Sequence, residues 1–356
     1  MIAATNGLFL QFPGNCFHLS FQSFVMKKIA CSFLLFILLF HAATAQQHIT
    51  NGANLENISY PFPVSYIHLD IQGEKLQMAY MDVQPAKPNG QAIMLLHGKN
   101  FNGAYWRETA KRLQQEGYRV IIPDQIGFGK SSKPEHIQYT FQLLARNTKA
   151  VLDTLNITRL TVLGHSMGGM LATRFALMYP ETVTKLILEN PIGLEDWKVY
   201  VPYQSVEEWY AAELKQTYTE IKNYQLKFYY DNKWKPEYDE WVNMIAGWTT
   251  NIDYPRIAWN SALLYDMIFT QPVCYEFDQL KMPVLLIIGQ RDRTALGKNK
   301  APAGVQDKLG NYPLLGKETA KKIRNSKLAE IDNTGHLPHI EAFEQFITPL
   351  ISFLKN

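Results

Sequence analysis

Short apolar segments alternate with helical patterns along most of this sequence, and this alternation restricts the possible folds more than any other feature. Residues 65–83 form two strand-like segments joined by a turn at Gln72-Gly73-Glu74-Lys75. Buried strands are then expected at "AIMLLHG", "YRVIIPD", "LTVLGHS", "TKLILENP", "PVLLIIGQRD" and, more weakly, "KLAEIDNTGH". Helices are expected at 105–115, 141–155, 170–178, 318–324 and 341–354. This order predicts βαβ units and a mostly parallel sheet flanked by helices.

The first 45 residues have the composition of a leader rather than of a folded domain. Two lysines at 27 and 28 precede an apolar run at 29–40, and Ala43-Thr44-Ala45 fits a small-x-small cleavage site. A membrane span needs about 20 apolar residues, so this run is short for one. We predict a start at Met26, cleavage after Ala45, and a secreted or periplasmic protein. The alternative is a membrane anchor formed by an uncleaved leader.

Charge and cysteine content exclude several classes of protein. The chain has 35 Lys and Arg against 32 Asp and Glu, and two of the lysines lie in the predicted leader, so the remainder is nearly neutral. A neutral chain offers no electrostatic basis for binding nucleic acid or an anionic membrane surface. Only Cys274 follows the leader, so no internal disulfide is expected. Stability must come from an apolar core, and a chain of this length with 47% hydrophobic residues can bury one.

One segment interrupts the alternation of strands and helices. Residues 193–270 contain no clear buried strand, and they hold six of the seven tryptophans together with many tyrosines. We predict that 193–270 form a helical cap inserted after the sixth strand, with 46–192 and 271–356 forming the core. Most of these aromatic residues are expected to pack within the cap. A few are expected to line an apolar pocket, because ligands of open α/β sheets bind beyond the carboxyl ends of the strands.

The stretch "LTVLGHSMGGM" places Ser166 between glycines where a buried strand gives way to a helix. Gly164-His165-Ser166-Met167-Gly168 matches G-x-S-x-G, the nucleophile elbow, in which a tight turn projects the serine hydroxyl above the sheet. A side chain at 164 or 168 would collide with neighbouring backbone, which explains both glycines. The Met167 N–H at the start of the helix can donate to an oxyanion. The spacing therefore predicts Ser166 as a catalytic nucleophile.

A catalytic serine needs a general base, and the base needs a carboxylate to orient it. The elbow is normally followed along the chain by the acid and then the histidine. Asp292 follows the strand in "VLLIIGQRD", and His336 lies in "IDNTGHLPHIEAF" before the final helix, so we assign them these roles. Glu189 at the end of "TKLILEN" is the alternative acid. His339 is expected at the surface, and a metal site there lacks ligands at suitable spacing, so no metal or cofactor is predicted.

The second oxyanion donor is expected in the loop after "AIMLLHG". The Lys99 N–H is the first candidate and the Asn100 N–H the second, while the Lys99 side chain is expected to be solvated. The glycine-rich loop 124–134 lacks the order G-x-x-x-x-G-K-[ST], so it is interpreted as packing beside the site rather than as a phosphate loop. The predicted pocket residues are His97, Gly98, Phe101, Trp106 and His165, and His165 is expected to pack rather than to act chemically.

These motifs resemble the α/β-hydrolase fold superfamily from about residue 64 to the C-terminus. The residues that carry the resemblance are His97-Gly98, "DQIGFGKSS", "GHSMGG", "GQRDRTA" and "GHLPHIEAFEQF". The resemblance implies an eight-stranded sheet, a cap after the sixth strand and a Ser–Asp–His hydrolase. Dehalogenases and soluble epoxide hydrolases of this fold have an aspartate where this chain has Ser166, and prolyl aminopeptidases carry a different elbow. The segment 293–317 is longer than the fold requires and is expected near the acid, with no assigned chemical role.

The sequence thus predicts a serine hydrolase that cleaves a small or medium apolar ester, or a related lactone or thioester, through an acyl-enzyme. C–C bond hydrolysis and cofactor-free perhydrolysis use the same groups and stay open as alternatives. A second class of function is a small-molecule receptor of this fold with little turnover. The sequence predicts a small-molecule partner, no nucleic acid and no stable membrane insertion, and leaves the oligomeric state open.

Overall fold

A computed structural model describes residues 50–356 of the chain. The predicted leader, with Met26, Ala45 and the alternative membrane anchor, lies outside the described residues. Within residues 50–356, no helix combines the length and the apolar composition that crossing a membrane requires.

The described residues contain an eight-stranded sheet with the order β1-β2-β4-β3-β5-β6-β7-β8. The strands are β1 (Val64–Ile71), β2 (Glu74–Val83), β3 (Ala92–Leu96), β4 (Arg119–Pro123), β5 (Leu160–His165), β6 (Val183–Glu189), β7 (Val284–Gly289) and β8 (Ser326–Ile331). Strand β2 runs antiparallel to β1 and β4, and the pairs from β4 to β8 are parallel. Strands were therefore predicted correctly in every apolar segment, including the first hairpin.

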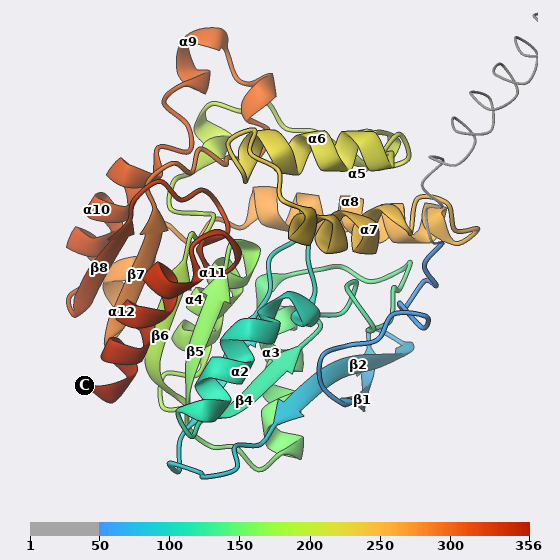
Figure 1. Cartoon of the computed structure of the whole chain (residues 1–356). Helices are drawn as coiled ribbons and strands as arrows, with labels where there is room; N and C mark the ends of the chain where they lie inside the picture. The colour runs from blue at the N-terminus through green and yellow to red at the C-terminus, as the bar shows by residue number, and fades with distance from the viewer. Residues whose placement is uncertain (1–49) are drawn as a thin grey trace, which may run out of the picture. The chain divides into compact units, whose positions relative to one another are not determined.

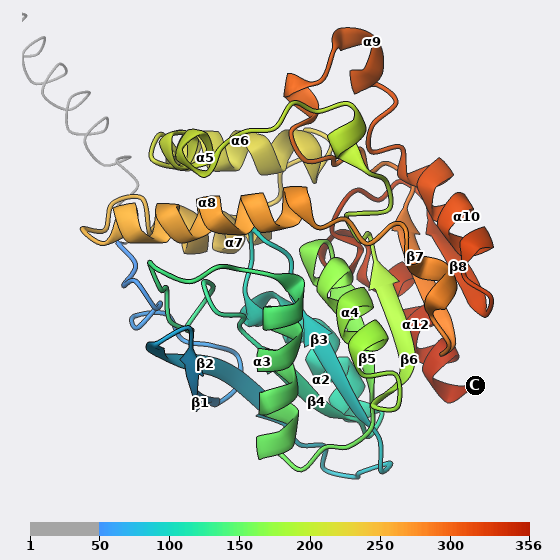
Figure 2. The ribbon, with the colours of Figure 1, turned by 180° about the vertical axis from the view of Figure 1, so that it is seen from behind.

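Helices cover both faces of this sheet (Figures 1 and 2). Figure 1 shows α2 and α12 on one face, and Figure 2 shows α3 and α4 on the other. The helices of the core are η1 (Gly103–Trp106), α2 (Arg107–Gln115), α3 (Phe141–Thr154), α4 (Met167–Met178), η4 (Phe277–Gln279), α10 (Tyr312–Lys322), α11 (Pro338–Glu341) and α12 (Phe343–Lys355). Alternate residues of β3 enter different hydrophobic clusters, Met94 on one face and Ile93 on the other, as the two-residue period of a strand requires.

The segment between β6 and β7 contains helices and no strand. Its elements before η4 are η2 (Trp197–Val199), α5 (Val206–Glu213), α6 (Tyr218–Phe228), η3 (Pro236–Tyr238), α7 (Asp239–Ala246) and α8 (Tyr254–Thr270). Figure 1 shows α5, α6, α7 and α8 lying across the end of the sheet at which the arrows of the parallel strands terminate. We call residues 193–270 the cap. The boundary between the cap and the core is taken from the sequence-based prediction.

Two elements differ from the sequence-based expectation. Helix α4 begins at Met167, three residues before the expected start and directly after the turn at Ser166. The long segment after Asp292 forms η5 (Lys298–Lys300) and α9 (Ala303–Gln306) before α10 begins at Tyr312. There the Gly310 N–H donates to the Glu195 carboxylate at 2.7 Å, so this segment packs against the start of the cap.

Candidate active site

Ser166 occupies the turn between β5 and α4 in a strained backbone conformation. Its φ is 56° and its ψ is −121°, a region that costs a non-glycine residue about 1–3 kcal/mol. Three backbone hydrogen bonds hold it there. The Ser166 N–H donates to the Glu189 carbonyl at 3.2 Å, and the Ser166 carbonyl accepts from Gly169 at 2.9 Å and Ile192 at 3.2 Å. The surrounding backbone thus fixes the serine at the end of the sheet.

The glycines that flank Ser166 are required by close backbone approach. A Cβ atom on Gly164 would lie 2.1 Å from the Gly168 carbonyl oxygen, and a Cβ atom on Gly168 would lie 2.2 Å from the Leu96 carbonyl oxygen. Contacts this short do not occur in folded proteins, so neither position accepts a side chain without a backbone shift. The steric explanation given for these glycines from the sequence is confirmed.

The structure brings Ser166, His336 and Asp292 into one chain of hydrogen bonds. His336 Nδ1 lies 2.7 Å from Asp292 Oδ2, and His336 Nε2 lies 2.9 Å from Ser166 Oγ. Since an ionised carboxylate can only accept, Nδ1 carries the proton and Nε2 accepts from the serine hydroxyl. All three side chains are buried. This is the arrangement in which a histidine can remove the serine proton.

Asp292 is held by partners that the sequence analysis missed. Asn190 donates from Nδ2 to Asp292 Oδ2 at 2.7 Å and accepts from the Gly289 N–H at 2.9 Å. The Thr294 N–H donates to Asp292 Oδ1 at 2.8 Å. Although burial opposes ionisation, the charge and hydrogen bond of His336 together with Thr294 lower the pKa of Asp292 below its ordinary value. The sequence signal for Asn190 is its place just after β6. The structure gives it a φ of 36°, a positive value that asparagine adopts more readily than most residues.

The two predicted oxyanion donors have free N–H groups. Among residues 50–356, the backbone N–H groups of Met167, Lys99 and Asn100 donate to no protein acceptor. A Cβ atom on Gly98 would lie 3.1 Å from Ser166 Cβ, so the start of this loop packs directly against the serine. Free N–H groups next to a nucleophile are what a tetrahedral oxyanion requires.

His165 lies within the elbow and connects three parts of the site. Its Nε2 donates to the His336 carbonyl oxygen at 2.7 Å, so its Nδ1 must accept, here from the Tyr105 hydroxyl at 3.0 Å. The Tyr105 oxygen in turn accepts from the Gly98 N–H at 2.9 Å. Burial, together with the nearby His336 and His339, holds the pKa of His165 well below its ordinary value. His165 is therefore a neutral packing residue, as expected.

The expectation that His339 lies at the surface was wrong. Only 4% of His339 is exposed, and its ring packs at 4.4 Å between centroids against Trp106. Glu189 Oε1 accepts from both the backbone N–H and Nδ1 of His339, at 2.8 and 2.9 Å. Glu189 thus pairs with His339 and not with His336, which leaves Asp292 as the carboxylate at His336.

Tyr229 belongs to the cap and covers the face of His336. The two rings stack with centroids 5.1 Å apart, and Tyr229 is buried. Its hydroxyl accepts from Asn100 Nδ2 at 2.9 Å, so the cap contacts both His336 and the loop with the free N–H groups. The sequence analysis included Tyr229 only among the many tyrosines of residues 193–270, because nothing in its sequence neighbourhood distinguishes it.

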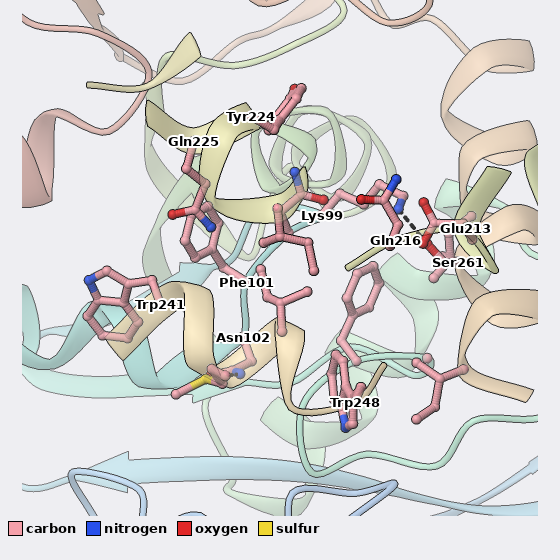
Figure 3. A pocket seen from close by; sticks show the side chains of 18 of the residues that line it. Lys99, Phe101, Asn102, Glu213, Gln216, Tyr224, Gln225, Trp241, Trp248 and Ser261 are labelled. Atoms are coloured by element: carbon pink, nitrogen blue, oxygen red, sulfur yellow. Dashed lines mark hydrogen bonds between the residues drawn. The ribbon is translucent and has the colours of Figure 1, made fainter. Parts of the chain in front are cut away.

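A cavity of about 300 Å³ lies between the cap and the loop 99–102 (Figure 3). Its wall is mixed, with aromatic and aliphatic side chains together outnumbering the polar ones, and the aromatic lining residues include Phe128, Tyr224, Trp241, Trp248, Tyr254 and Tyr265. The loop residues Lys99 and Asn100 form part of the wall, while Ser166 and His336 do not line it. The cavity is therefore bounded by the loop that carries the free N–H groups.

Of the predicted pocket residues, Phe101 lines this cavity and the others do not. His97 is buried, where its Nε2 accepts from the Gln125 N–H at 3.0 Å and its Nδ1 donates to the Gly98 carbonyl at 2.9 Å. Trp106 lies in the core against His339, while Gly98 and His165 belong to the hydrogen-bond chain described above. The Lys99 side chain, expected in solvent, instead extends into the cavity.

The glycine-rich loop 124–134 is held by its own polar groups. Asp124 accepts from the Gly103 N–H at 2.6 Å, the Lys130 N–H at 2.7 Å and the Tyr60 hydroxyl at 2.7 Å. The buried Lys133 ammonium donates to the carbonyls of Gly129 and Ser131. This loop therefore packs beside the site, and the Lys130 N–H and the Lys133 ammonium donate within the loop. No cluster of His, Cys, Asp and Glu suited to a metal ion occurs within residues 50–356.

Both the sequence and the structure of this chain are similar to those of known proteins. The α/β hydrolase fold profile matches residues 91–212. The crystal structure of a probable hydrolytic enzyme from Pseudomonas aeruginosa has a TM-score of 0.86 and 51% sequence identity, and the match covers 87% of this chain and 100% of that one.

Two curated proteins match shorter parts of the chain. An uncharacterized protein of Mycobacterium tuberculosis is 38% identical over 106 residues, which are 30% of this chain and 30% of that protein. A 2-hydroxy-6-oxononadienedioate/2-hydroxy-6-oxononatrienedioate hydrolase of Paraburkholderia phymatum is 38% identical over 126 residues, 35% of this chain and 43% of that protein. The chain therefore spans less than half the length of these two relatives.

Proposed function

Because this chain belongs to the α/β-hydrolase fold family, we propose that it is a serine hydrolase that cleaves a small or medium carboxylic ester, or a related lactone or thioester, through an acyl-enzyme. The observation that carries the proposal is the hydrogen-bond chain from Ser166 Oγ through His336 to Asp292, at 2.9 and 2.7 Å. We further propose that the protein is secreted or periplasmic, on the composition of its first 45 residues.

In the first half of the reaction, Ser166 Oγ attacks the ester carbonyl carbon. His336 Nε2 takes the hydroxyl proton, and Asp292 stabilises the imidazolium that forms. The carbonyl oxygen becomes an oxyanion, which the N–H groups of Met167 and Lys99 stabilise, each such donor contributing about 3–4 kcal/mol in comparable sites. His336 then gives its proton to the leaving alcohol, and the acyl-enzyme remains.

In the second half, water replaces the alcohol. His336 removes a proton from the water, whose oxygen attacks the acyl carbon, and the same N–H groups hold the second oxyanion. The bond to Ser166 Oγ breaks as His336 returns the proton to the serine, which releases the carboxylic acid. Tyr229 stacks on the ring of His336 throughout this sequence of steps and covers one face of the imidazole.

The nucleophile distinguishes this reaction from dehalogenation. Attack of a serine hydroxyl on a haloalkane would give an alkyl ether, which these groups cannot hydrolyse, whereas an acyl ester contains the carbonyl that water can attack. A hydroxyl nucleophile therefore supports acyl transfer.

The cavity argues against a dicarboxylate substrate of the kind named for the Paraburkholderia relative. Lys99 is the single cation among the lining residues, and Glu213 and Glu220 are the anions. Two carboxylates on one substrate would face more negative than positive charge. The aromatic and aliphatic lining residues instead favour an acyl chain that is mainly apolar.

The test is labelling of the purified protein, expressed from the full chain, with a fluorescent fluorophosphonate, followed by a series of p-nitrophenyl esters of increasing acyl length. Labelling should disappear in Ser166→Ala, and kcat on the esters should fall by about 10⁴-fold or more in that variant. A folded protein that neither labels nor hydrolyses any ester would refute the proposal and favour a ligand-binding role.

A further inference from the structure

The cavity under the cap has one polar end, and no role described so far uses it. Lys99, Glu213, Gln216 and Ser261 lie there together, whereas Trp241 lies on the opposite side (Figure 3). Lys99 comes from the loop after β3, Glu213 ends α5, and Ser261 lies in α8. Three separate segments therefore contribute polar groups to one region of the cavity.

Lys99 is held at this end by the cap. Its Nζ donates to Ser261 Oγ at 2.7 Å and lies 3.4 Å from the centroid of the Tyr265 ring. Within residues 50–356, no carboxylate lies within salt-bridge distance of this ammonium. An ammonium has three N–H donors. One of them is left over after the hydrogen bond to Ser261 and the contact with the Tyr265 ring. Burial lowers the pKa of Lys99 to about 8, which agrees with a cation that lacks a direct anionic partner.

Glu213 and Gln216 have unused hydrogen-bonding capacity beside Lys99. Among the described residues, neither the Glu213 carboxylate nor the Gln216 amide has a hydrogen-bond partner, although Glu213 contributes to the electrostatic field at Lys99. The polar end therefore offers a donor from Lys99, an acceptor from Glu213 and both from Gln216.

We propose that this polar end, Lys99, Glu213 and Gln216, recognises a hydroxyl group at the far end of the substrate's acyl chain, so that the enzyme acts on ω-hydroxyacyl esters. A hydroxyl donates one hydrogen bond and accepts others, which matches the mixed set of partners. The inference rests on the proposed esterase function.

The charges at the polar end disfavour the other possible end groups. A terminal carboxylate would be attracted by Lys99 but repelled by Glu213, and a terminal ammonium the reverse, so neither charge gains a net attraction that offsets the cost of removing it from water. A terminal methyl group would leave the polar groups of Lys99 and Glu213 without hydrogen bonds to the substrate. Sites that hydrogen-bond a substrate hydroxyl reject analogues that lack the hydroxyl.

The position of the cavity assigns it to the acyl half of the ester. His336 must reach the leaving oxygen to protonate it, and His336 does not line the cavity. The loop that does line it carries the Lys99 N–H, at which the carbonyl oxygen would lie. Lysine holds its ammonium on a four-carbon stem, so an acyl chain of about five or six carbons spans the distance from that N–H to Nζ.

The experiment compares four ethyl esters of nearly equal length by ethanol release: ethyl 6-hydroxyhexanoate, ethyl heptanoate, monoethyl adipate and ethyl 6-aminohexanoate. The wild-type protein should favour the hydroxy ester over heptanoate in kcat/KM by about ten-fold or more. Lys99→Met keeps the backbone N–H and should reverse that order. Glu213→Gln should reduce the discrimination against monoethyl adipate, while Lys215→Met, an exposed lysine on the same cap, should leave all the ratios unchanged.

The outcomes separate this inference from the proposed function. Hydrolysis of all four esters with heptanoate preferred, and the same ratios in Lys99→Met, would overturn the hydroxyl subsite and leave the esterase intact. A reversed order in Lys99→Met with an unchanged unfolding temperature supports the subsite and excludes misfolding. Absence of turnover on these esters and on every p-nitrophenyl ester would overturn both.

Discussion

The imidazole of His165 donates from Nε2 to the backbone carbonyl of His336 at 2.7 Å, which ties the nucleophile elbow to the loop that carries the base. The same ring accepts from Tyr105, whose oxygen accepts from the Gly98 N–H. One hydrogen-bond chain therefore joins the loop with the free N–H groups, the serine turn and the histidine loop. Its residues are buried, so loss of one member leaves its partners unsatisfied.

Tyr105→Phe removes the central hydroxyl of this chain while keeping the ring. The Gly98 N–H and His165 Nδ1 both lose their partners, and each buried unsatisfied group costs about 1–3 kcal/mol. We expect the free energy of unfolding in urea to fall by about 2–4 kcal/mol, and kcat on a p-nitrophenyl ester to fall with it. Tyr118→Phe is the matched control, because the hydroxyl of that buried tyrosine has no hydrogen-bond partner within residues 50–356. Equal losses in both variants would contradict the prediction.

Asn190→Asp places a second carboxylate where Nδ2 now donates to Asp292 at 2.7 Å. The hydrogen bond becomes a repulsion between like charges, so the pKa of the carboxylate pair must rise from the lowered value of Asp292. We expect the acid limb of the kcat/KM profile to move to higher pH by about one unit or more. Asn190→Gly tolerates the positive φ and removes both side-chain hydrogen bonds of Asn190 without adding a charge, so its kcat should fall with a smaller shift. An unmoved acid limb in Asn190→Asp would show that the ionisation of the carboxylate pair does not limit the activity.

Lys99 makes stability depend on pH in a defined window. Its pKa is about 8 in the folded protein against an ordinary 10.5, so the unfolded chain binds more protons between these values. The cost of burying the charged amine is complete below about pH 8 and disappears as the pH rises toward 10.5. The free energy of unfolding of the wild type, measured relative to Lys99→Met, should therefore rise between pH 7.5 and pH 10. Because the tyrosines are present in both proteins, their titration cancels in the difference between the two free energies of unfolding. A constant difference would indicate that Lys99 keeps its ordinary pKa.

Gly168→Ala tests the steric requirement of the elbow. The added Cβ would lie 2.2 Å from the Leu96 carbonyl oxygen, so α4 and β3 must separate. We expect a loss of about 3 kcal/mol or more in the free energy of unfolding, and insoluble expression if stability is exhausted. Gly304→Ala in α9 is the control, because a Cβ there has no atom within 4 Å. It should be neutral or slightly stabilising, since alanine favours a helix over glycine.

The strands, the elbow and the order of Ser166, Asp292 and His336 could be predicted because each depends on local pattern. Five or six consecutive apolar residues identify a strand that is buried on both faces, as in β7. The glycines around Ser166 reflect contacts within one turn and with the adjacent strand. Such features leave a signature in a few neighbouring residues.

His339 and Lys99 could not be placed by the same reasoning. His339 follows a proline at a helix start, a setting typical of the surface, yet it is buried against Glu189, 150 positions earlier in the chain. Lys99 has the charge of a solvated residue, yet Ser261, 162 positions later, accepts its hydrogen bond inside the cavity. In both cases the environment is supplied by a distant segment.

The sequence by itself determined the fold class and singled out Ser166, His336 and Asp292, because hydrophobic periodicity and steric limits at tight turns act over a few residues. The tertiary structure alone decided which carboxylate meets which histidine, how Asn190 and Tyr229 support the site, and that Lys99 enters the cavity. These contacts depend on how the cap, which includes α8, packs against the loops after β3 and β8. Packing brings together residues that are more than a hundred positions apart, and no local pattern encodes which of them will touch.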